Sequence, residues 1–378
     1  MTLPTYLKYL EDHFEEMIAD VKTVVEAESP STDKPLLDRT ANVVGDLLTQ
    51  SGFEVITIPE SVGGNHVRGY LPGRDREAAP ILILAHYDTV WKAGTLADMP
   101  FSYRDGVMRG PGVFDMKTGL VQAVWAIRAL QEQGGLRRSV VFLSNSDEEI
   151  GSVYSRPLIE EEAERAYAAL VFEASHHGAL KTARKGTCIY EWRIRGRAAH
   201  AGLDPTAGVS AIDELADQIV AIRALANPEM GTTVNVGVVH AGTRSNVVAA
   251  EAQAAIDIRV ASGAEAERVV DFMRRLAPRR EGIQLEVSGG LNRPPMERTP
   301  RVAELFEVAR AVGHSLGLDL AEASVGGASD GNFCAARGIP VVDGLGAVGN
   351  GAHAADEHVI AETMPVRAAL AAGLIARL

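Results

Sequence analysis

Apolar residues along this chain follow two patterns, and each pattern predicts a kind of secondary structure. In several segments they recur at spacings of three and four, which is typical of helices with one buried face. These segments span residues 7–24, 37–48, 120–130, 210–225, 264–276 and 302–316. Unbroken apolar runs at 81–85, 139–143 and 168–172 instead indicate central strands, with further strands at 54–58, 66–71 and 339–342. The combination predicts an α/β fold with a mixed, mostly parallel sheet flanked by helices.

The pattern changes near residue 186, where apolar and polar positions begin to alternate. Residues 188–195 alternate as a strand with one solvated face should. A helix follows, then strands at 233–239 and 252–260, a second helix and a strand at 284–287. This order is typical of a compact α+β sandwich with an antiparallel sheet. We therefore predict that residues 186–292 form a domain inserted into an α/β domain made of residues 1–185 and 293–378.

Composition agrees with two domains and narrows the choice of partners. A chain of 378 residues exceeds one ordinary domain, and its hydrophobic content of 46% supports a large buried core. The 37 Lys and Arg residues face 50 Asp and Glu residues, which leaves a formal charge of −13. Nucleic-acid binding depends on clustered Lys and Arg, so we expect no nucleic-acid partner.

Cysteine usage and the N-terminal sequence bear on the compartment. The two cysteines, Cys188 and Cys334, lie far apart and lack metal-type spacing, so we expect reduced, buried thiols. The first residues lack the apolar core of a secretory signal. The longest apolar stretch is shorter than the ~18 residues that a membrane span requires. We therefore expect a soluble, cytoplasmic protein without a membrane partner.

Five short segments carry side chains that bind metals or move protons, and most of them directly follow an apolar run. They contain His86 with Asp88, Asp115, the pair Glu148 and Glu149, Glu173, and His353. Ligands of open α/β sheets bind beyond the carboxyl ends of the strands, so we expect one polar site built from several strand ends. Two dications ~3.5–4 Å apart need a bridging carboxylate and terminal imidazole or carboxylate ligands. The segments supply enough of both for two divalent cations.

The local spacing suggests separate roles for some of these residues. Asp88 follows His86 by two positions, so both face the same side of an extended strand, and Asp88 can orient the imidazole. Neighbours at a strand end point in different directions, so one of Glu148 and Glu149 should bind metal and the other act as general base. The spacing leaves open which does which. Taken singly, these residues also fit ordinary roles, since residues 147–149 could be the acidic first turn of a helix.

Longer motifs in the same segments resemble one enzyme family. Residues 85–90, 110–119 and 147–152 resemble the co-catalytic zinc metallopeptidases of the glutamate carboxypeptidase, aminoacylase and succinyl-diaminopimelate desuccinylase superfamily. Residues 195–202 resemble the signature of that family's inserted dimerisation domain, also described as a lid. The resemblance covers nearly the whole chain, with its motifs in the family's order.

The resemblance implies two Zn²⁺ ions per subunit, for which Co²⁺ or Mn²⁺ could substitute. By position, His86 and Glu173 match the ligands of one ion, Glu149 and His353 match those of the other, and Asp115 matches the bridge. Glu148 then matches the general base and Asp88 the residue that orients the histidine. Family members often have a cis peptide bond after the bridging aspartate.

The resemblance also implies residues that contact substrate. His200 matches a histidine that reaches the active site of the partner subunit and stabilises the oxyanion, which implies a homodimer. Asn246 and Arg259 match contacts to a substrate carboxylate or carbonyl, while Gly327 and Ser329 lie in a glycine-rich turn, 326–331, beside the pocket. Lys181 and Arg293 resemble the branch that removes C-terminal glutamate. The alternatives without a functional role are that these two cations are solvated surface charges and that the turn is only a tight connection.

Other function classes fit the sequence less well. Residues 115–119 superficially resemble a phosphoryl-transfer loop, but the chain has no Gly-x-x-x-x-Gly-Lys-[Ser/Thr] motif. Neither cysteine has the context of a hydrolase nucleophile. Loss of Glu148 or of a ligand would favour a non-enzymatic relative, and none of them is lost. We therefore expect zinc-dependent hydrolysis of an amide bond that releases C-terminal Glu or Asp from a small peptide or N-acyl conjugate. The alternative is an N-acyl-amino-acid amidohydrolase, a deacylase or a dipeptidase of the same superfamily.

Overall fold

The computed structural model describes residues 3–378 and divides the chain into two units, each with its own apolar core. Unit 1 comprises Met1–Ala183, Arg298–Ser324 and Ser329–Leu378. Unit 2 comprises Arg184–Glu297 and the short segment Val325–Ala328. The chain therefore passes between the units at four points.

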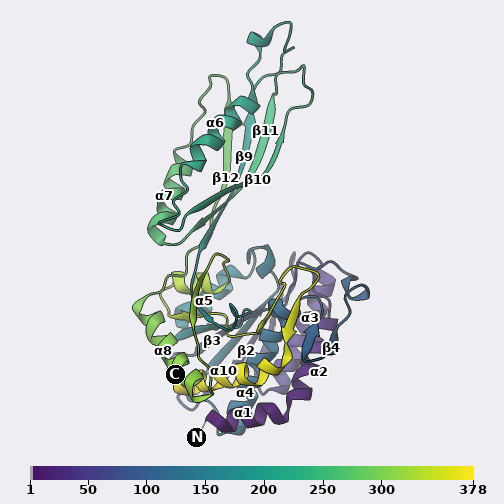
Figure 1. The fold of residues 1–378 in the computed structure, drawn as a ribbon, viewed down its shortest axis with the longest axis vertical. Helices are drawn as coiled ribbons and strands as arrows, with labels where there is room; N and C mark the ends of the chain where they lie inside the picture. Colours follow the sequence, from purple (N-terminus) through teal and green to yellow (C-terminus); the bar gives the residue numbers. More distant parts are fainter. Residues whose placement is uncertain (1–2) are drawn as a thin grey trace. The chain divides into compact units, whose positions relative to one another are not determined.

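A six-stranded sheet forms the centre of unit 1 (Figure 1). Its strands, in spatial order, are β1 (Glu54–Ile58), β2 (His66–Leu71), β6 (Val140–Asn145), β3 (Ile81–His86), β7 (Ala168–Val171) and β14 (Val341–Val342). From β6 to β14 neighbouring strands run parallel, whereas β2 is antiparallel to both of its neighbours. Every residue of β3 and β6 is buried, as their unbroken apolar runs predict. The predicted mixed, mostly parallel sheet is confirmed.

Helices cover both faces of this sheet, and most of them share one core with it. They are α1 (Leu3–Asp12), α2 (Phe14–Glu26), α3 (Lys34–Gln50), α4 (Thr118–Glu132), α5 (Arg156–Arg165), α8 (Pro300–Ser315), α9 (Gly331–Ala336) and α10 (Met364–Arg377). The prediction of a single helix over residues 7–24 is wrong, because the helix is interrupted at His13, between α1 and α2. There the ring Nδ1 lies 2.8 Å from the Tyr9 carbonyl oxygen. The apolar spacing continues across the break and therefore does not reveal it.

A small sheet of very short strands brings two distant parts of unit 1 together. Its strands, in order, are β15 (Gly349–Asn350), β16 (His358–Ile360), β5 (Val107–Arg109) and β4 (Ser102–Arg104). His358 pairs with Arg109 in this sheet. The segment that follows β5 thus lies beside the loop between β15 and β16. Elsewhere, β8 (Leu180–Arg184) and β13 (Glu322–Val325) form a two-stranded sheet.

Unit 2 is an antiparallel sheet packed against two helices, in the predicted order along the chain. Its elements are β9 (Gly186–Arg195), α6 (Ala211–Arg223), β10 (Thr233–Ala241), β11 (Glu251–Val260), α7 (Gly263–Arg274) and β12 (Gln284–Arg293), and the strands lie in the order β10-β11-β9-β12. Buried and exposed residues alternate along most of β9, as the sequence pattern predicts. Both helices begin at a serine, Ser210 or Ser262, whose side chain accepts a backbone N–H three residues on.

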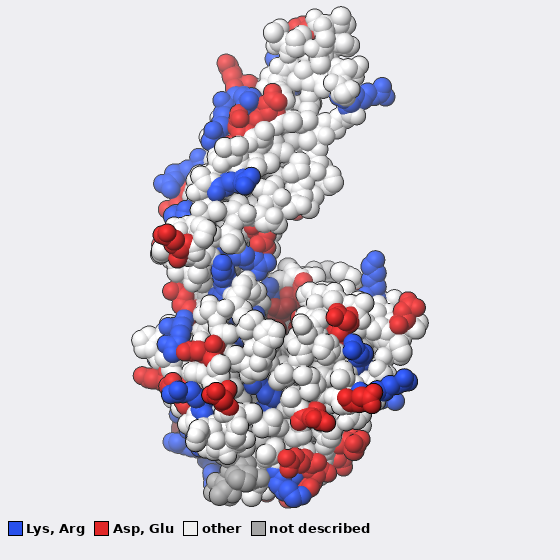
Figure 2. Space-filling view, viewed as in Figure 1, with Lys and Arg blue, Asp and Glu red and all other residues white. Residues whose placement is uncertain are grey.

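Charge on the surface is mixed in sign. Figure 2 shows acidic and basic side chains interspersed over the visible face of each unit. Many of them form exposed pairs one helical turn apart, such as Arg165 with Glu161 at 2.7 Å. Separately, none of the helices within residues 3–378 is long and apolar enough to cross a membrane.

Candidate metal centre

Three parallel strands carry candidate ligands to one edge of the sheet. His86 is the last residue of β3, Glu149 lies in a short turn after β6, and Glu173 follows β7. His86 pairs with Asn145, the last residue of β6, so these strands end together. Because parallel strands share a direction, the polar side chains gather beyond one edge, where ligands of α/β sheets bind.

Asp115 reaches this edge from a different kind of segment, an irregular turn at residues 113–117 that leads into α4. The peptide bond between Asp115 and Met116 is cis, as the family resemblance implies. Gly112 opens the turn with φ +72°, a conformation that side chains disfavour. Gly119 lies so close to the end of β7 that a Cβ there would be 1.9 Å from the Phe172 carbonyl oxygen. Gly112 thus allows the backbone conformation of the turn, and Gly119 lets the start of α4 pack against the segment that carries Glu173.

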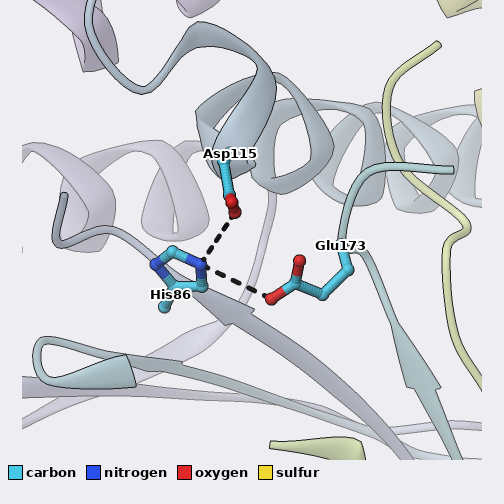
Figure 3. Close-up of side chains that lie close together, drawn as sticks. All are labelled: His86, Asp115 and Glu173. Atoms are coloured by element: carbon cyan, nitrogen blue, oxygen red, sulfur yellow. Dashed lines mark ion pairs between the residues drawn. The ribbon is translucent and has the colours of Figure 1, made fainter. Parts of the chain in front are cut away.

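One group of candidate ligands consists of His86, Asp115 and Glu173 (Figure 3). The Nε2 atom of His86 lies 3.4 Å from Oδ1 of Asp115 and 3.5 Å from Oε1 of Glu173. The imidazole is almost fully buried, with 1% of its side chain exposed. Within residues 3–378 its Nε2 makes no hydrogen bond, although two carboxylates face it.

A second group consists of Asp115, Glu149 and His353 and shares the aspartate with the first. His353 Nε2 lies 3.4 Å from the other aspartate oxygen, Oδ2, and 3.1 Å from the Glu149 carboxylate. The two oxygens of Asp115 therefore face different imidazoles. His353 itself has φ +62°, which is uncommon outside glycine and is often found at functional sites.

The donor atoms of both groups fit zinc. Zinc bound tetrahedrally at ~2.0–2.1 Å places neighbouring ligand atoms about 3.3 Å apart. The separations measured here lie between 3.1 and 3.5 Å. Imidazole and carboxylate are both common zinc ligands, and a carboxylate shared between two groups is what a paired metal site requires. The residues present could therefore hold two metal ions with Asp115 between them.

Electrostatics in this cluster favour added positive charge. The carboxylates of Asp115 and Glu149 raise the pKa of His353 to about 10. Burial opposes ionisation of His86, but Asp115, Asp88 and Glu173 raise its pKa well above the usual value. Burial also opposes ionisation of Asp115, yet the two histidines lower its pKa, whereas burial raises the pKa of Glu149. Protons or metal ions can supply the charge that the carboxylates need, and the two compete for the same atoms.

Asp88 connects the first group to the turn that carries the acidic pair. This fully buried carboxylate lies 3.3 Å from His86 Nδ1 and accepts a hydrogen bond from Ser31 Oγ at 2.7 Å. It also accepts the backbone N–H groups of Glu148 at 3.1 Å and Glu149 at 3.2 Å. One carboxylate thus lies beside the imidazole of His86 and accepts two N–H groups of the acidic turn.

The structure separates the two acidic neighbours. Glu149 faces His353 and Asp115, while Glu148 precedes it in the turn and is partly buried outside both groups. The sequence spacing left this choice open. The arrangement places Glu149 among the candidate metal ligands, whereas Glu148 belongs to neither group.

Two predicted substrate residues lie in unit 1. Lys181 is on β8, where its backbone N–H donates to the Asp343 carbonyl at 2.8 Å. Ser329 is buried, and its hydroxyl donates to the Asp343 carboxylate at 2.6 Å and accepts the Gly331 N–H at 3.2 Å. Both residues are therefore connected to the loop that follows β14.

The other predicted substrate residues belong to unit 2. His200 is exposed, and its Nδ1 accepts the N–H groups of Gly202 and Leu203 at 3.1 Å. The carbonyl of Asn246 accepts the Ala201 N–H at 3.0 Å, so it lies beside the same turn. Arg259 pairs through two nitrogens with Asp257, at 2.8 Å each.

The remaining two members of this set, Arg293 and Gly327, differ in exposure, because Gly327 is exposed. Arg293 is buried at the end of β12. The carbonyl of Gly327 accepts a hydrogen bond from Arg184 at 3.0 Å. The glycine-rich turn is divided between the units, since Val325–Ala328 belongs to unit 2 and Ser329 to unit 1.

One buried carboxylate near the site was not among the predicted residues. Glu357 is fully buried and accepts backbone N–H groups from the turn that carries Asp115. In sequence it follows Ala354, Ala355 and Asp356 rather than a long apolar run, so no periodic pattern marks it. Its position four residues after His353 is the only local signal.

Comparisons with known proteins show similarity over most of the chain. The family model described as peptidase family M20/M25/M40 matches residues 82–377. Carboxypeptidase G2 from Pseudomonas sp. (strain RS-16) is 29% identical over 95% of this chain and 88% of its own length. Succinyl-diaminopimelate desuccinylase from Thioalkalivibrio sulfidiphilus is 28% identical over 79% of this chain and 84% of its own. A dinuclear metal binding peptidase from Bacillus subtilis shares the fold, with a TM-score of 0.72, 18% identity and coverage of 97% of this chain and 98% of its own.

Proposed function

Because the chain belongs to peptidase family M20/M25/M40 and is a hydrolase of peptide or amide bonds, we propose that it is a two-zinc enzyme that releases a C-terminal amino acid. The observation that carries this proposal is the pair of ligand groups joined by Asp115. The fold relative from Bacillus subtilis is described as dinuclear, which supports two ions here. We also expect a cytoplasmic homodimer.

The residues of the cluster have different roles in the proposed hydrolysis of the amide bond. Zinc ions held by the two groups would polarise the scissile carbonyl and lower the pKa of the attacking water. Glu148, beside the ligand Glu149, accepts the proton of that water and delivers it to the leaving amine nitrogen. Asp88 keeps His86 oriented and holds the turn that carries Glu148 through a backbone N–H at 3.1 Å.

His200 is proposed to complete the site of the partner subunit by stabilising the oxyanion. Its side chain is exposed, while its turn is held by hydrogen bonds to its own ring nitrogen. If the role is exercised in trans, inactive Glu148→Ala and inactive His200→Ala proteins should regain activity when their subunits are exchanged. Each mixed dimer would then contain one site with both groups intact. The measurement is hydrolysis after mixing; persistent inactivity despite demonstrated exchange would exclude a shared site.

For the substrate we propose a peptide or N-acyl conjugate that ends in Glu or Asp. The similarity to carboxypeptidase G2 supports this choice over other branches of the family. Lys181 and Arg293 are proposed to bind the acidic side chain, and Arg259 the α-carboxylate. The second candidate is an N-acyl-amino-acid deacylase or a dipeptidase, and the similarity to succinyl-diaminopimelate desuccinylase favours the deacylase.

Arg293→Ala separates these two candidates on a panel of N-acyl-glutamates, N-acyl-aspartates and neutral analogues, assayed with zinc added. A charge-assisted hydrogen bond contributes roughly 1.5–3 kcal/mol, so kcat/KM for acidic substrates should fall roughly 10- to 100-fold. Analogues ending in Ala or Leu should be much less affected, because the cluster acts on the amide whatever the side chain. Arg259→Ala is the matched control and should weaken all of these substrates alike.

Equal losses on acidic and neutral substrates in Arg293→Ala would remove the acidic preference. The protein would then be a general N-acyl-amino-acid hydrolase, and the proposed metal chemistry would stand.

A further inference from the structure

The carboxylate of Glu357 is surrounded by four N–H donors. Its Oε1 accepts the backbone N–H groups of Phe114 at 2.8 Å and Asp115 at 3.1 Å. Its Oε2 accepts the backbone N–H of Gly112 at 3.0 Å and the Trp91 indole N–H at 2.8 Å. The residue is fully buried. Burial raises its pKa, while the three backbone bonds act in the opposite direction because they stabilise the ionised form.

These donors come almost entirely from the turn that carries the shared aspartate. Three N–H groups within the four residues from Gly112 to Asp115 converge on one side chain, so the turn is wrapped around a fixed acceptor. One of the donors is the amide of Asp115 itself. The path of the main chain through this aspartate therefore depends on where the Glu357 carboxylate lies.

Glu357 also connects this turn to the second imidazole. It lies four residues after His353 and directly precedes His358, which begins β16. The strand pairing of His358 with Arg109 holds the two segments side by side. A displacement of either segment relative to the other would thus be felt at the contact between His353 and Asp115, now 3.4 Å.

We propose that Glu357 is a positioning residue that sets where Asp115 lies between the two metal positions. This proposal rests on the proposed function, because it assumes a site that holds two metal ions. Glu357 itself contacts neither imidazole in this arrangement; it acts through the main chain of the aspartate turn. Loss of the Glu357 carboxylate should leave all the candidate ligands present but make the position of Asp115 between them less fixed.

Glu357→Gln is the sharpest variant because it keeps the size and one oxygen of the side chain. Each carboxylate oxygen now accepts two N–H groups. Glutamine would instead point its own NH₂ group at one of these pairs of N–H donors, so one acceptor oxygen and its two hydrogen bonds are lost and donors face donors. Changes in residues that support metal ligands typically weaken metal affinity ~10- to 100-fold. We expect a loss of this size for zinc, measured by competition with a chelator.

Glu214→Gln is the matched control in unit 2. Glu214 is also fully buried and accepts two backbone N–H groups, from Arg279 at 2.9 Å and Arg280 at 3.0 Å. A carboxylate that merely stabilises a loop should behave like Glu214, with zinc affinity unchanged. Unchanged zinc affinity in folded Glu357→Gln would overturn the proposal while leaving the proposed two-zinc function intact.

Hydrogen exchange gives a second readout that needs no metal and starts from the wild-type protein. In the metal-free wild-type protein, the amides of Gly112, Phe114 and Asp115 should be strongly protected, because Glu357 accepts all three. In Glu357→Gln, exchange over residues 112–115 should rise. Rapid exchange of these amides in the wild-type protein would contradict the proposal even if the variant failed to fold. A wild-type protein that binds no zinc would instead defeat the proposed function.

Discussion

Replacing Asp115 with alanine is expected to remove most of both metal ions, and with them nearly all activity. The reason is that its two oxygens serve different groups. Oδ1 lies 3.4 Å from the first imidazole, of His86, and Oδ2 lies 3.4 Å from the second, of His353. Alanine therefore removes one ligand from each group and the only carboxylate that joins them among residues 3–378.

Elemental analysis of protein purified without chelator checks this prediction. The wild type should approach two zinc ions per chain and Asp115→Ala should lose most of both. Glu173→Ala provides the comparison, because Glu173 belongs to the first group alone. That variant should lose mainly one ion. A wild-type protein that holds a single tightly bound ion with full activity would rule out the shared aspartate.

Glu148→Gln is expected to bind zinc normally and to lose at least roughly 10²-fold in kcat. General acid–base groups typically contribute 10²–10⁴-fold to a rate, and glutamine keeps the shape of glutamate while losing the ability to accept a proton. Glu148 lies outside both ligand groups. Metal content should therefore be unaffected by the change. The backbone bond from Glu148 to Asp88 does not involve the replaced atoms and should persist.

The adjacent residue supplies the control. Glu149 lies 3.1 Å from His353 Nε2, so Glu149→Gln should lower zinc content at the second group. The same Glu→Gln change at two neighbouring positions should thus have different primary effects. At Glu148 it should lower turnover without loss of zinc, and at Glu149 it should lower zinc content. The measurements are steady-state kinetics with zinc added and zinc content by elemental analysis. Near-wild-type turnover of metal-replete Glu148→Gln would assign the proton transfer to another residue.

Much of the fold could be predicted because local patterns of apolar and polar residues indicate the secondary structure. Unbroken apolar runs marked β3, β6 and β7, and each proved to be buried throughout. Alternation marked β9 as a strand with one solvated face. Unbroken runs arise because both faces of a central strand are buried, and alternation arises because only one face of a strand is buried. The break at His13 was missed because the apolar spacing runs through it unchanged.

The sequence by itself therefore determined which residues lie at the ends of the central strands, among them His86 and Glu173, and the motifs that mark the family. Only the tertiary structure decided how the separate segments meet. It turned Glu149 toward His353. It also placed the Glu357 carboxylate against the backbone N–H groups of a turn more than 240 residues earlier in the chain. Strands of two or three residues hold the two segments together. Such strands are too short to show a period, and a buried carboxylate carries no pattern of its own. Contacts between distant residues arise from packing, so they cannot be read from spacing along the chain.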